Sequence, residues 1–156
     1  MPIRADLDAI DWKILGELQA DGRMTNVELS RRVGISAPPC LRRVKRLEEA
    51  GIIRGYRALL NGSSLGMDVV AFCLVGLQHQ SEVELRAFAE KTREWAIVRD
   101  AWMVNGDSDF LLHCVATDLA TFQNFVIEDL TSTPNVGTVR TSLTIRQVKE
   151  EGPVAI

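Results

Sequence analysis

The apolar positions near the start of the chain are spaced for a helix. Ile10, Ile14 and Leu18 recur at every fourth position, so their side chains share one helical face. Asp8 stands where it can cap this helix, and Gly22 follows its end. The pattern therefore predicts a first helix between these two residues.

Two further short helices are predicted in the next part of the chain. Thr25 begins a capping box with Glu28, so a second helix starts there and runs to Gly34. Ser36 is placed to cap a third helix, and the two prolines that follow fall in its first turn, where a missing N–H group costs little. Two short helices joined by a glycine turn are typical of a helix-turn-helix.

The third predicted helix has an apolar back and a basic front. Cys40, Val44 and Leu47 share one face, which is expected to hold the helix against its neighbours. The opposite face carries a proline and long cationic side chains: Pro39, Arg42, Arg43, Lys45 and Arg46. Such cations reach DNA phosphates and the O6 and N7 atoms of guanine. The predicted DNA-binding residues of this module are Thr25, Asn26, Ser36, Ala37, Pro38, Pro39, Arg42, Arg43, Lys45 and Arg46.

The segment after the third helix leads out of the module. Residues 52–60 have the composition of an extended strand, and Asn61–Gly66 has the glycine and serine content of a linker. The predicted organisation is a helix-turn-helix domain with its exit strand over residues 1–60, a linker over 61–66 and a second domain over 67–156.

The second domain alternates strands and helices. The predicted elements are a strand over residues 68–77, a helix capped by Ser81, strands over 96–105 and 109–116, a helix from Asp118 or Leu119 to Pro134, and a strand over 136–148. The order βαββαβ is that of a ferredoxin-like fold, in which both helices lie on one face of an antiparallel sheet. The predicted fold class is α+β, with an N-terminal winged-type helix-turn-helix joined to this C-terminal domain.

The strands of the second domain are apolar on both faces. In the first strand Val69, Ala71 and Cys73 point one way, while Val70 and Phe72 point the other. Helices cover only one face of such a sheet, and an apolar face needs a cover. We therefore predict a homodimer that forms through the open face.

Charge divides the chain in the same way. The 156 residues carry a net charge of -3, but residues 1–60 hold 11 Lys and Arg against 8 Asp and Glu. A basic helix face alone is often only solvated surface, whereas the caps, the glycine turn and this local charge excess together favour DNA binding. The three cysteines are widely spaced, and no apolar run is long enough to span a bilayer. We predict a cytoplasmic protein with reduced, buried thiols and no membrane contact.

The second domain shows no catalytic cluster, so no enzymatic activity, cofactor or metal is predicted. Its clearest chemical feature is the pair Asp107 and Asp109 beside a tight turn. The pair either only shapes the hairpin or presents groups that bind the ammonium and carboxylate of an amino acid. A redox role for Cys40 is disfavoured by its position on an apolar helix face.

Three stretches together resemble one known family. They are Leu-Asp-Ala-Ile-Asp at residues 7–11, Ser-Ala-Pro-Pro-Cys-Leu-Arg-Arg-Val-Lys-Arg-Leu-Glu-Glu-Ala-Gly-Ile-Ile-Arg-Gly-Tyr at 36–56, and Asn-Gly-Asp-Ser-Asp-Phe-Leu-Leu at 105–112. The chain resembles the Lrp/AsnC family of leucine-responsive, or feast/famine, transcriptional regulators. The likeness covers roughly residues 6–149 and includes both modules in the same order.

The resemblance implies a regulator of amino-acid metabolism whose dimers assemble into octamers. It also implies that an amino acid binds near the loop at Gly106 and Asp107, at contacts between dimers, and alters assembly or DNA affinity. The effector-binding residues that it implies are Met103, Val104, Asn105, Gly106, Asp107, Ser108, Asp109, Phe110, Thr141 and Leu143. Two positions depart from the family, since Ser108 replaces a frequent aromatic residue and Ala37 stands where a proline usually follows the capping serine.

We therefore expect a sequence-specific transcription regulator that binds a pseudopalindromic operator in double-stranded DNA and responds to a small amino acid. The alternative is an architectural DNA-binding protein that compacts DNA without an effector. An enzyme built on the second domain would need a nucleophile or a metal cluster, and the sequence shows neither.

Overall fold

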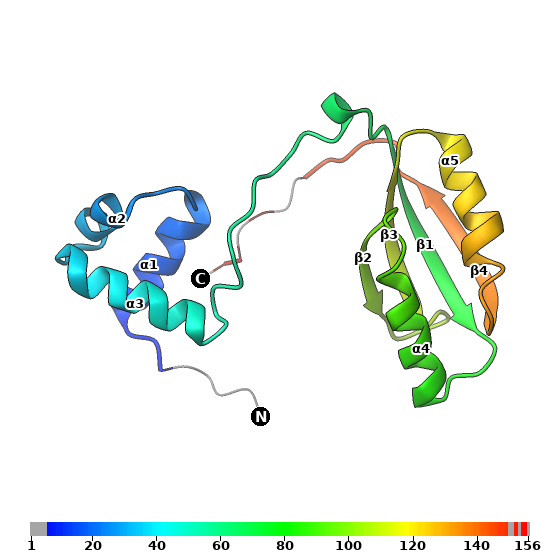
Figure 1. Cartoon of the computed structure of the whole chain (residues 1–156), viewed down its shortest axis with the longest axis horizontal. Helices are drawn as coiled ribbons and strands as arrows, with labels where there is room; N and C mark the ends of the chain where they lie inside the picture. Colours follow the sequence, from blue (N-terminus) through cyan, green and yellow to red (C-terminus); the bar gives the residue numbers. More distant parts are fainter. Residues whose placement is uncertain (1–5, 150–151, 153, 156) are drawn as a thin grey trace. The chain divides into compact units, whose positions relative to one another are not determined.

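The computed structural model describes residues 6–149, 152, 154 and 155, and the chain forms two compact units (Figure 1). Among the described residues, the first unit contains those up to Leu59 and those from Lys149 onward, while the second unit begins at Leu60. In the first unit the Gln19 side chain accepts a hydrogen bond from the Val154 N–H at 2.7 Å and donates one to the Val154 carbonyl at 3.2 Å. The end of the chain, which the sequence pattern assigned to the second domain, thus groups with the helical unit.

Three helices form the first unit, as the spacing predicted. They are α1 (Ala9–Ala20), α2 (Asn26–Val33) and α3 (Ala37–Glu49) (Figure 1). The buried apolar residues between them are Ile14, Leu29, Val33, Cys40 and Leu47. The apolar back predicted for the third helix is confirmed, because Cys40 and Leu47 both lie in this core.

Side-chain caps fix the starts of the first two helices. Asp8 accepts hydrogen bonds from the backbone N–H groups of Ile10 and Asp11, both at 2.9 Å. The Asp11 carboxylate in turn accepts from the Asp8 N–H at 3.2 Å, which completes a capping box. Thr25 accepts from the Glu28 N–H at 3.2 Å. These bonds satisfy N–H groups that have no partner within their own helix.

The third helix begins without a side-chain cap, which differs from the prediction. Ser36 occupies the N-cap position, but its hydroxyl accepts no capping hydrogen bond. A capping hydroxyl bonds the N–H of the second or third helical residue, and these residues are Pro38 and Pro39, which have no N–H. The exposed Ser36 hydroxyl is therefore not used by the helix that it precedes.

No strand forms in residues 51–60, so the predicted exit strand is wrong. The backbone N–H groups of Ile52 and Ile53 instead both bond one carbonyl in the last turns of α3. Gly51 and Gly55 adopt φ values of 69° and 146°, which interrupt an extended backbone. Strand propensity alone is insufficient here, because the described residues of this unit include no second strand to pair with.

The second unit has the predicted order of elements. They are β1 (Val69–Leu77), α4 (Glu82–Thr92), β2 (Val98–Met103), β3 (Phe110–Ala116), α5 (Leu119–Asn124) with a π-helical continuation (Phe125–Leu130), and β4 (Val136–Leu143). The strands form one antiparallel sheet in the order β2-β3-β1-β4, with the helices on one face (Figure 1). This is the ferredoxin-like arrangement of an α+β fold. A short 3-10 turn, Ser63–Leu65, lies in the linker before it.

The last strand is shorter than predicted. β4 ends at Leu143 rather than at residue 148, because it pairs with β1 and β1 begins only at Val69. The Thr144 N–H makes the last hydrogen bond between the two segments, to the Val70 carbonyl. Beyond this point β1 offers no further partner, so the strand stops.

A π-helical turn changes which residues of the second helix of this unit are buried. The spacing predicts Val126 and Leu130 on the inner face, but Phe125 is buried as well. The Thr131 N–H bonds a carbonyl five residues back, so the turn holds more residues than an α-helical one. The ring of Phe125 is thereby rotated into the core, where its centroid lies 5.3 Å from that of Trp95.

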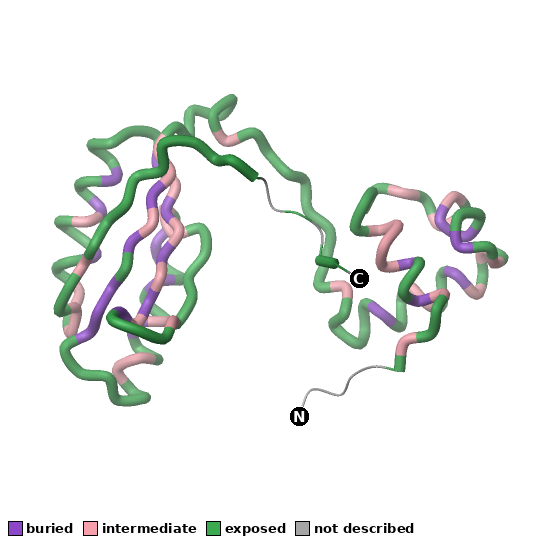
Figure 2. Tube along the Cα trace, turned by 180° about the vertical axis from the view of Figure 1, so that it is seen from behind, coloured by how far each residue is buried: buried purple, intermediate pink, exposed green. Residues whose placement is uncertain are grey.

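Within the described part of the second unit, helices cover only one face of the sheet (Figure 2). In β1, Ala71, Cys73 and Val75 are fully buried on the helix side, whereas Phe72 is half-buried and Leu74 is 36% exposed on the other side. The open face continues into β2 and β3 through Trp102, Leu111 and Val115. The strands are thus apolar on both faces, as the sequence pattern predicted.

The three cysteines are free thiols in the two cores, as predicted: Cys40, Cys73 and Cys114. The sulfur atoms of Cys73 and Cys114 lie 3.9 Å apart on neighbouring strands. The hydrogen bond with Cys73, together with burial, raises the pKa of Cys114, so this thiol stays protonated. A protonated, buried thiol packs like a small apolar side chain.

We predict that the two N-cap residues differ in their effect on stability. Thr25→Ala removes a capping hydrogen bond and should lower the free energy of unfolding of the helical unit by about 1 kcal/mol. Ser36→Ala removes no such bond, so the change should stay within about 0.5 kcal/mol. Hydrogen exchange in peptides from residues 6–59 of the full-length protein measures both effects. Equal losses in the two variants would show that Ser36 also stabilises its helix.

Candidate DNA-binding surface and effector site

A buried carboxylate ties the third helix to the first. Asp11 of α1 is fully buried and accepts hydrogen bonds from Arg43 Nη1 at 2.8 Å and Arg46 Nη2 at 2.5 Å. Arg43 Nη1 also donates to Asp8 Oδ2 at 2.7 Å. Because Asp8 and Asp11 form the capping box of α1, the start of α1 and the middle of α3 share one network. We call these four residues the Asp11 cluster.

Folding favours the charged forms of two residues in the cluster. The backbone N–H of Asp11 and the Arg43 guanidinium lower the pKa of Asp8. Hydrogen bonds to Asp11 and Asp8 raise the pKa of Arg43. Because the pKa of Asp8 is lowered by folding, its carboxylate stabilises the fold fully above the ordinary aspartate pKa. This contribution is lost as the pH falls through the lowered value.

The four predicted cations of α3 divide into two pairs. Arg43, whose side chain is 27% exposed, and Arg46 both bind Asp11. Arg42 and Lys45 are exposed, and no ion pair with another described residue engages either of them. Arg42 and Lys45 can therefore contact a polyanion without breaking an ion pair, and Arg46, whose side chain is 56% exposed although it binds Asp11, adds to the same basic surface.

Asp11 was not predicted, although its position carried a signal. It precedes Ile14 by three residues, so the two side chains share one face of α1. A carboxylate on an apolar face must find cationic or hydrogen-bonding partners when the face is buried. The predicted basic helix supplies those partners through Arg43 and Arg46.

The predicted residues at the starts of α2 and α3 lie close to one another. The Asn26 side-chain N–H donates to the Ala37 carbonyl at 2.8 Å, across the turn that joins the helices. The Oδ1 atom of Asn26 is buried and accepts no hydrogen bond from the described residues. Ser36 and Pro38 are exposed beside this contact, and Thr25 caps α2. Asn26 therefore fixes the turn, while Ser36 and Pro38 are open to a ligand.

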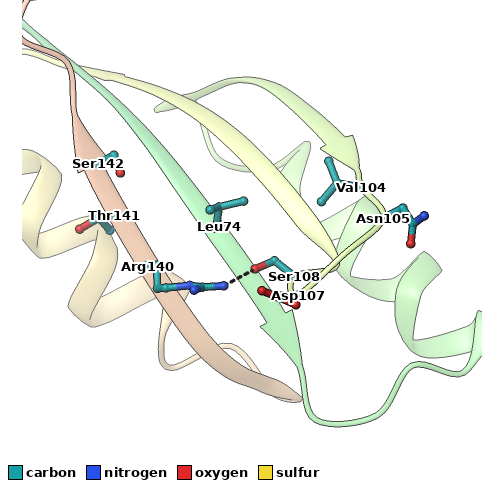
Figure 3. A pocket seen from close by; sticks show the side chains of 8 residues that line it. All are labelled: Leu74, Val104, Asn105, Asp107, Ser108, Arg140, Thr141 and Ser142. Carbon is teal, nitrogen blue, oxygen red and sulfur yellow. Dashed lines mark hydrogen bonds between the residues drawn. The ribbon is translucent and has the colours of Figure 1, made fainter.

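A hollow of about 780 Å³ lies at one end of the open face of the sheet (Figure 3). Its walls come from β1, β4 and the turn between β2 and β3. The lining residues are Leu74, Val104, Asn105, Asp107, Ser108, Arg140, Thr141 and Ser142. The residues from this set that the family resemblance had implied are Val104, Asn105, Asp107, Ser108 and Thr141.

A cation and a carboxylate are both present in this hollow. Arg140 of β4 pairs with Leu74 of β1 and extends across that strand toward the β2–β3 turn (Figure 3). There its Nη2 atom donates to Ser108 Oγ at 3.3 Å, and the exposed Asp107 lies beside Ser108. A guanidinium and a carboxylate near an apolar side chain can bind the two charged groups of a free amino acid.

The remaining predicted effector residues lie outside the hollow. Asp109 holds the turn, because its carboxylate accepts a hydrogen bond at 2.7 Å from a backbone N–H of β1. Phe110 is buried among the aromatic rings of the core. The others that do not line the hollow are Met103, Gly106 and Leu143, and Gly106 supplies the positive φ of 131° at the turn. Of the two aspartates, Asp109 shapes the hairpin and Asp107 lines the hollow.

Three lining residues were not predicted: Leu74, Arg140 and Ser142. All three lie on the open face, since Arg140 is opposite Leu74 and Ser142 is opposite Phe72 in the β1–β4 register. Alternation along the last strand shows which of its residues share a face. Alternation does not show which strand lies beside the last one, because that depends on the whole fold. It therefore does not predict that Arg140 reaches the turn between β2 and β3.

The described residues contain no group of three or more His, Cys, Asp or Glu side chains that could hold a metal ion. No helix among them combines the length and the apolar character that a membrane span needs.

Family models match both units of the chain. A winged helix-turn-helix DNA-binding model matches residues 7–54, and the Lrp/AsnC ligand binding domain matches residues 70–154, more than half of the chain. The chain belongs to the Lrp/AsnC family. It is a transcriptional regulator with a DNA-binding domain and an amino-acid-binding domain, in a family of proteins that are not enzymes.

Relatives match this regulator along all or nearly all of its length. The leucine-responsive regulatory protein of Rhizobium meliloti (strain 1021) is 70% identical over 156 residues, which is 100% of both chains. The leucine-responsive regulatory protein of Escherichia coli (strain K12) is 38% identical over 151 residues, 97% of this chain and 92% of that protein.

Solved structures share the fold of this regulator. The transcriptional regulator NMB0573 from Neisseria meningitidis, in complex with L-Met, has a TM-score of 0.89 and 39% identity over 96% of both chains. An AsnC family transcriptional regulator from Agrobacterium tumefaciens has a TM-score of 0.86 and 29% identity, again over 96% of both chains. The two-unit architecture is therefore that of the family.

We predict that Arg43 stabilises the helical unit and that Arg42 contributes little to its stability. Arg43→Ala leaves the buried Asp11 with fewer partners and should lower the free energy of unfolding of the helical unit by about 2 kcal/mol. Arg42→Ala removes an exposed side chain and should change that free energy by less than about 0.5 kcal/mol. Urea unfolding followed by hydrogen exchange in the α1 and α3 peptides gives both values.

The matched control is Asp11→Asn, which removes the charge but keeps the size of the side chain. If Arg43 acts through Asp11, the double variant Asp11→Asn with Arg43→Ala should lose less stability than the sum of the two single losses. Strictly additive losses would refute the coupling.

Proposed function

We propose that this regulator controls genes of amino-acid metabolism by sequence-specific binding to operators, and that a small amino acid in the hollow alters its assembly or its DNA affinity. The observation that carries the proposal is the presence of Arg140 and Asp107 in one hollow with Leu74. No cofactor is needed for this role. The operator lies in the chromosome, so we place the regulator in the cytoplasm.

The hollow suits a free amino acid. In the proposed complex Arg140 binds the α-carboxylate and Asp107 binds the α-ammonium group. Ser108 orients the guanidinium through the hydrogen bond at 3.3 Å. The effector side chain then packs against Leu74 and Val104, which favours an aliphatic amino acid. Relatives named for leucine and the NMB0573 complex with L-Met support this choice.

We further propose that a second copy of the chain covers the open face of the sheet. Phe72, Leu111 and Trp102 lie on this face, which the unit's helices leave open, and His113 stacks on Phe72 beside them. A two-fold axis brings the same face of both copies together, since such interfaces are self-complementary. The dimer also presents two α3 helices to half-sites about 10 base pairs apart, as a pseudopalindromic operator requires. Octamers, which the family resemblance implies, stay a prediction.

The hollow lies on the face that the second copy covers. Leu74, Arg140 and Ser142 belong both to the hollow and to that face. An amino acid bound there has different contacts in the free and the assembled forms, so it shifts the balance between them. An architectural protein without an effector is the alternative, and the match of residues 70–154 to a ligand binding domain favours the effector.

We predict that one or more aliphatic amino acids bind the full-length protein and raise its Tm. Arg140→Gln and Asp107→Asn each remove one charged contact, so each should weaken binding at least about tenfold. Isothermal titration calorimetry with leucine, methionine and other free amino acids measures the Kd.

Arg146→Ala and Asp68→Asn are the matched controls, because they remove the same charges outside the hollow. Both should bind like the wild type. If Arg140→Gln and Asp107→Asn bound amino acids with wild-type affinity, the effector would have to bind at another site. Failure of every free amino acid to bind would instead favour the architectural alternative.

We predict that a charge at the centre of the open face separates the dimer. Leu111→Glu places a carboxylate where the second copy packs, so the protein should sediment as a smaller species with its helical content retained. Val83→Glu, on an exposed position of α4, is the control and should sediment like the wild type. Sedimentation velocity compares the three proteins. An unchanged Leu111→Glu species would place the interface elsewhere.

A further inference from the structure

Leu41 is an apolar side chain on the exposed side of α3. It is 44% exposed and is not part of the core of the helical unit. Arg42 follows it in the sequence, and Pro38 and Lys45 lie about one turn away on either side. All four of these residues are exposed, and we call them the Leu41 surface.

The Asp11 cluster determines that this surface points away from the unit. Arg43 and Arg46 bind Asp11 and so hold one side of α3 against α1. Cys40 lies in the core and fixes a second side. Successive residues of a helix are rotated by about 100°. The side of α3 that faces neither α1 nor the core is therefore the side that holds Leu41 and its exposed neighbours.

We propose that Leu41 packs against the C5-methyl group of a thymine in the major groove, and that it thereby contributes to operator specificity. In the major groove thymine presents this methyl group, whereas the other base edges present hydrogen-bonding atoms. An exposed leucine next to cations can contact the methyl while Arg42 binds a neighbouring guanine or phosphate. This inference requires DNA binding only, and it is independent of the amino-acid effector.

The charge around Leu41 favours DNA over a second protein copy. Lys45 lies one helical turn beyond Leu41, Arg42 follows it in the sequence, and residues 37–47 of α3 contain no carboxylate. The nearest acid beyond them, Glu48, accepts a hydrogen bond from the Tyr56 hydroxyl at 3.0 Å. Two copies of this surface would bring like charges together, whereas a DNA groove lined by phosphates attracts them.

Removal of single methyl groups from the DNA tests the proposal. Duplexes selected from a random pool by the full-length wild-type protein serve as the probe. Each thymine is then replaced in turn by deoxyuridine, which lacks only the C5-methyl group. We expect one position in each half-site at which this replacement weakens wild-type binding about fourfold, the value of one buried methyl group.

The Leu41→Ala variant should bind the thymine duplex more weakly and should no longer distinguish thymine from deoxyuridine at that position. Leu41→Met keeps an apolar contact and should retain the discrimination. Val83→Ala shortens an equally aliphatic exposed side chain in the other unit and should behave like the wild type. Fluorescence anisotropy at one fixed salt concentration compares all four proteins.

Two results would overturn the proposal. One is a wild-type protein that binds every deoxyuridine duplex as it binds thymine. The other is a Leu41→Ala variant that keeps the full thymine preference. If Leu41→Ala bound no duplex at all, the comparison of wild type with Leu41→Met would decide: loss of discrimination in Leu41→Met would contradict an apolar methyl contact.

Discussion

The buried carboxylate of Asp11 is the constraint on which the DNA-binding unit depends. A carboxylate removed from water requires charged partners, and the described structure supplies them from two successive turns of α3. These bonds fix the orientation of α3 about its own axis relative to α1. The side chains that α3 presents to a ligand are thus selected by ion pairs to a carboxylate that is itself fully buried. Stability and recognition in this unit have one physical origin.

Local signals in the sequence were sufficient for the helices but not for their details. Asp8 and Thr25 predicted the starts of α1 and α2 because capping acts over three or four residues. Ser36 marked the start of α3 correctly, yet its capping bond is absent because the prolines that follow lack the donors. Residues 52–60 have strand propensity without a partner, so the propensity alone misled.

The candidate effector site combines residues that are far apart in the sequence. Asp107 and Ser108 lie in one short turn, and such a turn can be predicted from its residue types. Arg140 is 32 residues from Ser108 and reaches it only because β4 pairs with β1 in one register. Such a register follows from the packing of the whole sheet, so a single sequence does not reveal it. Phe125 is a similar case, because its burial depends on a π-helical turn.

The contact between Gln19 and Val154 gives the helical unit an unusual order of completion. Gln19 lies in α1, whereas its backbone partner follows the whole sheet unit along the chain. The helices therefore gain their final contact only when the entire sheet unit has already been synthesised. Synthesis of the sheet unit therefore precedes formation of these two hydrogen bonds in the helical unit.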